Sequence, residues 1–280
     1  MRSPRSLERL RVRAPASTAN VGPGFDCAAV ALDLWNELEV IAGDEPPDLE
    51  HLGVRAFARV APVDGLSFRW TSRIPRERGL GSSAAVIALG LVAASLLEHG
   101  RADHEELFAY GLELEGHGDN LAAALAGGVC LTWEARIVRV ADRPPAAPIA
   151  VIPEATVSTA AARAALPDSV AHADAVFSAG RATLLGAALA SGSTELFGAA
   201  LDDRLHEPYR AAGAPLLGEI KQSLPAGALG ATLSGSGPTV IVWAADDGAD
   251  ACAAQLAERF PDERILRLES TTVGASTYSP

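Results

Sequence analysis

A glycine-rich loop that runs directly into an apolar helix places the strongest constraint on the fold of this chain. The loop and the start of the helix read IPRERGLGSSAA over residues 74–85, and the apolar pattern continues to residue 98. Gly79 and Gly81 have no Cβ, so the backbone there can turn sharply and approach a ligand closely. The first N–H groups of a helix have no partner within it and lie at the positive end of its dipole. The segment therefore predicts a site for an anion, for which phosphate is the natural candidate.

Two other interpretations of this loop must be weighed against a phosphate site. A Walker loop needs a lysine beside the hydroxyl residue, but Ser82 and Ser83 follow Gly81 directly, so this loop is excluded. An ordinary helix start, capped by Ser82 or Ser83, would have the same sequence. The loop alone does not separate the phosphate site from the ordinary cap.

Two further segments combine glycine with polar side chains. PASTANVGPGFD, at residues 15–26, follows a predicted strand and holds more hydroxyl, amide and carboxylate groups than a turn requires. We therefore expect a functional loop there. LSGSGPT, at residues 233–239, lies between two predicted strands, and on its own a hairpin turn is the simplest interpretation of it.

The composition favours an enzyme that acts on small molecules. The chain has 280 residues, of which 49% are hydrophobic, and its formal net charge is −12. A protein that binds a nucleic acid needs a basic surface, and no basic stripe follows the first fifteen residues, so we predict no nucleic-acid partner. The most apolar stretch, residues 84–97, is shorter than the roughly 18 residues that cross a bilayer, so we predict no membrane span.

The cysteines and the basic start of the chain bear on where the protein is found. Cys27, Cys130 and Cys252 are an odd number without CxxC spacing, so we predict neither a disulfide framework nor a zinc site, and a reducing cytoplasm. The first 13 residues contain five arginines interrupted by Glu8. We interpret them as a basic arm leading into the first strand, not as a transit peptide.

The periodic patterns predict an α+β protein divided into two domains, residues 1–148 and 149–280. The boundary falls at a proline cluster, ADRPPAAP at residues 141–148, because proline removes backbone donors and ends regular structure. In the first part we expect strands at 10–12, 37–41, 66–70 and 129–133 and helices at 82–98 and 104–115. In the second we expect strands at 149–152 and 264–268, a strand pair around 235–238, and helices at 159–165, 173–190, 214–223 and 249–260.

Taken together and in this order, the three glycine segments resemble the three motifs of the GHMP kinase superfamily. PASTANVGPGFD is similar to the N-terminal motif, PRERGLGSSAA to the nucleotide loop and LSGSGPTV to the C-terminal motif. The resemblance spans residues 15–243 and implies an N-terminal domain like domain 2 of ribosomal protein S5 and a C-terminal ferredoxin-like domain. It also implies ATP and Mg²⁺ as cofactors, bound at a site between the two domains.

Within the superfamily, the chain is most similar to the homoserine kinases. EGHGDN at 115–120, followed by AGG at 126–128, resembles their EGHPDN…GG segment, with Gly118 in place of proline; the strings at 152–167 and 203–210 add to the likeness. The resemblance implies phosphorylation of the γ-hydroxyl of L-homoserine in threonine biosynthesis, by a cytoplasmic homodimer. A kinase for another small alcohol, such as mevalonate or shikimate, and a non-catalytic nucleotide-binding regulator are the alternatives.

Homoserine carries a carboxylate, an ammonium group and a neutral hydroxyl, so its site needs cations as well as acceptors. Arg163 and Arg210 are candidates for a carboxylate clamp, since guanidinium matches carboxylate geometry, although a surface salt bridge is the simpler role of an isolated arginine. Acceptor roles for the ammonium group and the hydroxyl fall to Asn20, Asp26 and Asp119. The remaining candidates for substrate binding are His117, which could be structural, Thr159, which could cap a helix, and Gly235.

The resemblance implies further roles near the phosphates. Ser83 and Glu115 resemble the magnesium ligands of the family, although Glu115 could also be a solvated helix end, and Mg²⁺ commonly takes one or two protein oxygens. Glu115, Asp119 and Asn120 are the catalytic candidates. Asp119 aligns with an aspartate assigned as the base in mevalonate kinase, whereas homoserine kinases have been suggested to need none, so its role stays open. The residues that we expect to bind ATP are Pro75, Arg76, Glu77, Arg78, Gly79, Leu80, Gly81, Ser82, Ser83, Ala84 and Ala85.

Overall fold

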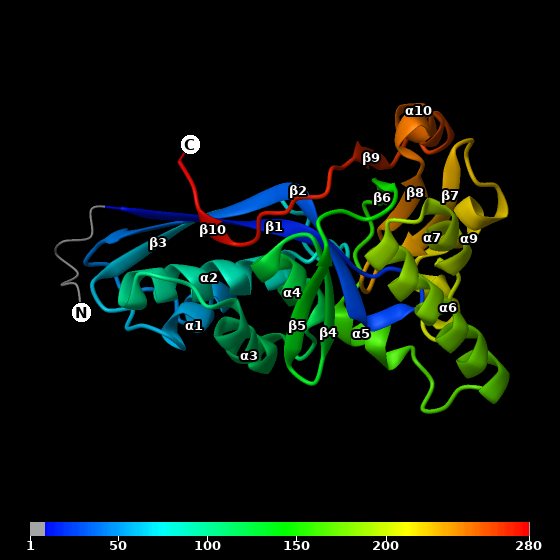
Figure 1. The fold of residues 1–280 in the computed structure, drawn as a ribbon. Helices are drawn as coiled ribbons and strands as arrows, with labels where there is room; N and C mark the ends of the chain where they lie inside the picture. The colour runs from blue at the N-terminus through cyan, green and yellow to red at the C-terminus, as the bar shows by residue number, and fades with distance from the viewer. Residues whose placement is uncertain (1–8, 280) are drawn as a thin grey trace.

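Two antiparallel sheets and the helices packed on them make up residues 9–279, the part of the chain that the computed structural model describes (Figure 1). The first sheet has the strand order β10-β1-β2-β4-β5, and β3 also pairs with the long strand β2. Its strands are β1 (Leu10–Asn20), β2 (Gly24–Ala42), β3 (Leu66–Thr71), β4 (Val129–Trp133), β5 (Arg136–Ala141) and β10 (Ser276–Thr277).

Helices α1 to α4 cover one face of this sheet, with α2 at the centre (Figure 1). Their bounds are α1 (Leu52–Ala58), α2 (Ser82–His99), α3 (His104–Glu115) and α4 (Asp119–Ala126). By length and composition, α2 is apolar enough to cross a membrane, but 61% of it is buried inside the protein. Gly90 lets it pack closely on α1, because a Cβ there would lie 2.1 Å from the carbonyl oxygen of Gly53. The apolar character of α2 is thus accounted for by its place in the core.

The second sheet has the strand order β7-β8-β6-β9, the order of a ferredoxin-like β-α-β-β-α-β unit. Along β8, Val240, Val242 and Ala244 pack in a core with α9 and α10, while Ile241 and Trp243 face the other side, which carries α6 and α7. Burial of both faces explains why β8 is a continuous apolar run. The elements of this half are β6 (Ala147–Ile152), α5 (Thr159–Ala164), α6 (His172–Ser191), α7 (Thr194–Ala200), α8 (Glu207–Arg210), α9 (Pro215–Gln222), β7 (Ala228–Leu233), β8 (Val240–Ala244), α10 (Ala249–Arg259) and β9 (Arg264–Arg267).

The segment after β9 returns to the first sheet. The N–H group of Ala275 donates to the carbonyl of Ala124 at 2.7 Å, and β10 pairs Thr277 with Val12 on the free edge of β1. The first sheet is therefore completed by a strand that follows the whole second sheet in the sequence. The predicted boundary between two domains, after residue 148, falls inside β6, which begins at Ala147, and the segment after β9 returns to the first sheet. The division of the chain into domains at this point therefore stays a prediction.

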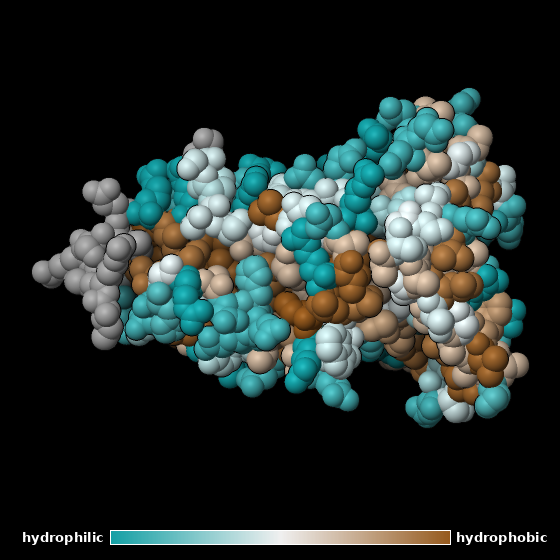
Figure 2. All heavy atoms as spheres, in the orientation of Figure 1, coloured by the Kyte–Doolittle hydropathy of each residue, from teal (hydrophilic) through white to brown (hydrophobic). Residues whose placement is uncertain are grey.

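The α+β class is confirmed, and the expected helices and strands occur, several with wider bounds. One expectation was wrong: residues 15–26 are not a loop after a strand but the end of β1, a tight turn and the start of β2. Of the basic arm, residues 1–8 lie outside the described residues, while Arg9 and Arg11 both pair with Glu39. Figure 2 shows an apolar area near β4 and β5. Trp133, the last residue of β4, is 49% exposed.

Candidate active site

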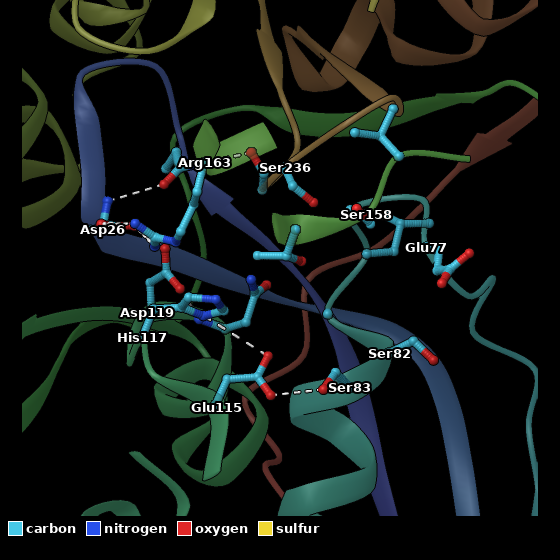
Figure 3. A pocket seen from close by; sticks show the side chains of 18 of the residues that line it. Asp26, Glu77, Ser82, Ser83, Glu115, His117, Asp119, Ser158, Arg163 and Ser236 are labelled. Carbon is cyan, nitrogen blue, oxygen red and sulfur yellow. Dashed lines mark hydrogen bonds and ion pairs between the residues drawn. The ribbon is translucent and has the colours of Figure 1, made fainter. Parts of the chain in front are cut away.

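One open pocket between the two halves brings most of the predicted site residues together (Figure 3). Its walls come from the β1–β2 hairpin, the glycine loop before α2, the α3–α4 connection, α5, α8 and the turn before β8. The predicted residues that line it are Asn20, Asp26, Pro75, Glu77, Gly79, Leu80, Gly81, Ser82, Ser83, Glu115, His117, Asp119, Asn120, Thr159, Arg163, Arg210 and Gly235.

Four residues of the predicted nucleotide loop do not line the pocket. Ala84 and Ala85 are buried in the core, and the side chain of Arg76 is exposed. Arg78 is turned away, because its guanidinium donates to the carbonyl oxygens of Pro153 and Glu154 at 2.8 and 2.5 Å. None of these four side chains lines the pocket, and Arg78 instead ties the loop to the second half.

The glycine loop is held tightly against the turn before β8. Gly79 and Gly81 adopt φ values of 75° and 66°, which glycine favours. A Cβ on Gly79 would lie 2.0 Å from the carbonyl oxygen of Ser234, and one on Gly81 would lie 2.1 Å from Oγ of Ser17. Both positions thus require glycine for their backbone conformation and for the space available.

The start of α2 has no side-chain cap, so the idea that Ser82 or Ser83 caps it was wrong. Gly81 is the N-cap residue, and the first turn contains no acidic residue. Ser83 instead donates a hydrogen bond of 2.7 Å to Glu115, which approaches from the end of α3. The first N–H groups of α2 therefore face the pocket without competition from a capping oxygen, as an anion site requires.

Two carboxylates lie beside this helix start, on either side of the α3–α4 turn: Asp119 is buried and Glu115 is half-buried (Figure 3). Burial raises the pKa of Asp119 to about 6, and the nearby charge of Asp26 adds to the rise. Burial also raises the pKa of Glu115, against the hydrogen bond from Ser83. Both groups thus lie in surroundings that favour a bound cation or a bound proton.

Gly118 and Asn120 fix the turn that carries Asp119. A Cβ on Gly118 would lie 2.5 Å from Cζ of Phe108, which explains how glycine suits this turn. Oδ1 of Asn120 accepts a hydrogen bond of 2.7 Å from Ser17 of β1. Asn120 therefore links α4 to β1, the strand behind the glycine loop. His117, which lies between α3 and α4, turns its ring into the pocket (Figure 3).

The β1–β2 hairpin carries its polar residues in strained backbone. Asn20 and Asp26 have φ values of 73° and 57°, which cost about 1 kcal/mol or more for residues other than glycine. The Asn20 amide holds them, since its oxygen accepts from the N–H of Asp26 at 3.0 Å and its nitrogen donates to the carbonyl of Gly235 at 2.8 Å. The hairpin tip is thereby tied to the turn before β8.

Asp26 and Arg163 lie in direct contact at one side of the pocket (Figure 3). Two hydrogen bonds, of 3.0 and 2.7 Å, join the guanidinium of Arg163 to the carboxylate of Asp26. These bonds raise the pKa of Arg163, and each side chain is 38% exposed. Arg210 lies beside them, buried, and contacts no carboxylate among the described residues. Asp26 and Arg163, which we expected to bind the ammonium group and the carboxylate of an amino acid, are thus paired with each other in the structure.

Three lining residues were missed from the sequence: Val157, Ser158 and Ser236. Ser158 is the N-cap of α5, and its Oγ accepts from the N–H of Ala161 at 3.1 Å, so the cap that was considered for Thr159 lies one residue earlier. A serine before an alanine-rich helix is a signal that could have found it. Ser236 lies within the LSGSGPT motif and Val157 within the string at 152–167, so the family resemblance was the signal that could have found both.

Two family models, one for each domain of the GHMP kinases, match this chain. The family model for the N-terminal domain of GHMP kinases matches residues 50–128, and the model for their C-terminal domain matches residues 185–262. The homoserine kinase of Clavibacter michiganensis is 40% identical over 96% of this chain and 93% of that protein. That of a Synechococcus strain is 40% identical over 87% and 88%. The chain therefore belongs to the homoserine kinase family.

Solved structures agree with this assignment. A homoserine kinase from Cytophaga hutchinsonii has a TM-score of 0.86 at 26% identity, with 99% of each chain covered. A putative homoserine kinase from Listeria monocytogenes has a TM-score of 0.79 at 30% identity, over 97% of this chain and 100% of that one. A mevalonate kinase has a TM-score of 0.71 at 16% identity, over 94% and 99%, a likeness of fold alone.

Proposed function

We propose that this enzyme transfers the γ-phosphoryl group of ATP to the γ-hydroxyl of L-homoserine and releases O-phospho-L-homoserine and ADP. The observation that carries the proposal is the placement of an uncapped helix start, suited to phosphate, beside Asp26, Arg163 and Arg210. These three side chains match the opposite charges of an amino acid. The family relationship supports the same substrate.

The Asp26–Arg163 pair gives the pocket a means of selecting a zwitterion. An amino acid can offer its ammonium group to Asp26 and its carboxylate to Arg163 and Arg210. When it binds, Asp26 replaces Arg163 with the ammonium group, and Arg163 replaces Asp26 with the carboxylate of the substrate. A substrate with a carboxylate alone would draw Arg163 away and leave Asp26 without a cation, which costs free energy. This argument favours homoserine over mevalonate and shikimate, which carry no ammonium group.

The phosphates of ATP would lie along the loop at residues 75–83, where main-chain N–H groups and the α2 dipole supply positive potential. Asp119 is the group we assign to accept the proton of the substrate hydroxyl as the oxygen attacks the γ-phosphorus. A carboxylate with a pKa of about 6 is largely ionised at pH 7 and is basic enough for this role. Positioning and charge neutralisation supply the rest of the rate enhancement.

Ser83 and Glu115 fit a magnesium site. Their oxygens meet at 2.7 Å beside the start of α2, and a hydroxyl and a carboxylate are hard donors of the kind that Mg²⁺ takes together with phosphate oxygens. Bound there, Mg²⁺ would neutralise charge on the phosphates. Among the described residues, no group of three or more His, Cys, Asp or Glu side chains is placed to hold a metal ion.

Substrate-dependent ADP release tests the proposed function. We expect ADP release with L-homoserine to have a kcat/KM about 10- to 100-fold higher than with 4-hydroxybutyrate, which lacks the ammonium group, or 3-aminopropan-1-ol, which lacks the carboxylate. Faster release with mevalonate or shikimate would contradict the proposal. ATP binding without turnover would indicate a regulator instead.

Replacing Glu115 with glutamine is expected to raise the Mg²⁺ concentration for half-maximal activity at least about tenfold, since a neutral amide binds Mg²⁺ more weakly than a carboxylate. A Mg²⁺ titration of the activity measures the change. Glu113→Gln is the matched control, because Glu113 lies on the same helix but is 62% exposed and pairs with Arg59. An unchanged Mg²⁺ requirement in Glu115→Gln would exclude Glu115 as a ligand.

Three wider properties are part of the proposal. The product would serve threonine biosynthesis, as the family does. A cytoplasmic location is supported by Cys27, Cys130 and Cys252, all of which are free thiols. A homodimer is the expected assembly, and the molecular mass in solution tests it.

A further inference from the structure

His206, which does not line the pocket, is buried completely beneath Arg210. Its two ring nitrogens have different neighbours. Nε2 lies 2.9 Å from the carbonyl oxygen of Gly22, in the tip of the β1–β2 hairpin. Nδ1 lies 3.4 Å from Nη1 of Arg210, one helical turn further along the chain. The imidazole therefore connects the hairpin that carries Asn20 and Asp26 with an arginine of the pocket.

The two hydrogen-bond contacts of the ring select one protonation state of His206, and the carboxylate of Asp203, 3.7 Å from Nε2, also favours a hydrogen on that nitrogen. A carbonyl oxygen can only accept, so Nε2 must carry the hydrogen; a guanidinium can only donate, so Nδ1 must offer its lone pair. The ring is thus neutral, in the Nε2–H tautomer. Burial lowers the pKa of His206 and Arg210 lowers it further, whereas Asp203, the hydrogen bond to Gly22 and Asp26 act in the opposite direction.

Arg210 is oriented by three acceptors, of which His206 is one. Its Nε donates to the carbonyl of Ala162 at 3.2 Å, and its Nη1 donates to the carbonyl of Gly235 at 3.1 Å and faces Nδ1 of His206. Its other amino group, Nη2, has no hydrogen-bond partner among the described residues. The arginine therefore holds a fixed direction and keeps donors free for an anion in the pocket.

Phe25 completes the arrangement. Its ring stacks on His206 with a centroid distance of 4.9 Å and an angle of 19°. The guanidinium carbon of Arg210 lies 5.1 Å from the centre of the same ring, and that of Arg163 lies 5.9 Å from it. Displacing the imidazole would therefore disturb the platform under both arginines.

We propose that His206 is a positioning residue for the carboxylate of the amino-acid substrate, acting through the hydrogen bond that its Nδ1 accepts from Arg210. The proposal rests on the proposed function, because it assumes that Arg210 binds that carboxylate. His206 itself touches neither substrate nor nucleotide.

Two substitutions separate the two nitrogens of the ring. Glutamine can place its amide nitrogen near the position of Nε2 and keep the bond to Gly22, but it offers no acceptor at the position of Nδ1. Asparagine can place its oxygen near the position of Nδ1 and keep the acceptor for Arg210, but it loses the bond to Gly22. We expect His206→Gln to raise the KM for L-homoserine about tenfold with kcat changed less than about twofold, and His206→Asn to retain most of the wild-type KM.

Substrates without a carboxylate show whether the effect passes through Arg210. In His206→Gln, the KM for 3-aminopropan-1-ol should equal that of the wild type, so the preference for homoserine over this amine falls about tenfold. An equal loss with both substrates would mean that the substitution only loosens the fold. Ser178→Ala is the matched control, since Ser178 accepts from the N–H of Arg204 at 3.1 Å in the same segment and does not bond to Arg210.

A measurement on the unaltered protein keeps the proposal testable if the variants fold poorly. Nitrogen-15 NMR of the histidine rings should show His206 as the neutral Nε2–H tautomer at pH 7. A hydrogen on Nδ1, or an unchanged KM in His206→Gln when the wild type is active, would overturn the inference. A wild type without homoserine-dependent ADP release would instead overturn the proposed function, and the NMR result would be unaffected.

Discussion

Replacing Asp119 with asparagine is expected to lower kcat about 10³-fold and, at the same time, to stabilise the protein. The loss of rate follows from the loss of the proton acceptor. The gain in stability follows from burial, because an ionised carboxylate at this site is unfavourable, and asparagine keeps an oxygen for the N–H of Asn120. Steady-state kinetics and thermal unfolding of the same variant measure both effects.

The pH dependence of stability shows why Asp119→Asn is expected to stabilise the protein. Because the folded pKa of Asp119, about 6, exceeds its ordinary value of 3.8, the native state binds the proton more tightly than the unfolded state. The carboxyl group therefore destabilises the fold increasingly as pH rises from about 4 to 6, by about 2–3 kcal/mol above that range. Asp119→Asn should match the wild-type stability at pH 4 and exceed it at pH 8.

The rate should follow the same ionisation. Wild-type kcat is expected to fall about tenfold per pH unit below pH 6, and the residual activity of Asp119→Asn should lack this dependence. Asp103→Asn is a suitable control, since Asp103 caps α3 outside the pocket and asparagine caps equally well. If Asp119→Asn raised only the KM for homoserine, Asp119 would bind the substrate without taking its proton.

Replacing Gly79 with alanine is expected to lower kcat/KM for ATP at least about 100-fold. A methyl group there would meet the main chain of Ser234, which cannot rotate away as a side chain could, so the loop must move from the turn before β8. A displacement of about 1 Å in a phosphate-binding loop is enough for such a loss. Kinetics with ATP as the varied substrate measures it.

Gly100→Ala is the control that separates the effect of backbone strain in Gly79→Ala from the effect of displacing the loop. Gly100 follows the last residue of α2 and has a φ of 72°, close to that of Gly79. A methyl group on Gly100 would have open space around it, with nothing within 4 Å. Alanine there should reduce stability by about 1 kcal/mol and leave the kinetics with ATP unchanged. Wild-type kinetics in Gly79→Ala would show that the contact with the turn does not position the loop.

Local patterns predicted much of the fold because their causes are local. The helix at 104–115 begins at a capping aspartate and ends at a glycine with φ of 80°, both visible in the sequence. The strand at 15–20 was hidden by Pro15 and small polar residues, because a β-bulge at Pro15 lets the proline fit within the sheet. The short helix α1 was missed because its glycine, Gly53, which leaves room for the ring of Trp70, reduces its helical propensity.

Residue types predicted the members of the candidate site, but not their partners. We expected Arg163 and Arg210 to bind the carboxylate of the substrate. In the structure, Arg163 forms two hydrogen bonds with Asp26, from which it is separated by 137 positions in the sequence. The contact between His206 and Gly22 spans 184 positions. Such pairings depend on how the two halves pack, which no local pattern records.

The pairing of β10 with β1 has a consequence for biosynthesis. β10 follows β1 by more than 250 positions, so the ribosome makes it after every other described strand. While the nascent polypeptide emerges, the outer edge of β1 has main-chain donors and acceptors without partners, and such an edge can pair with strands of other chains. Synthesis that pauses between β9 and β10 should therefore expose the molecule to aggregation at this edge, because β10 covers it at Val12 and Arg13 only after leaving the tunnel.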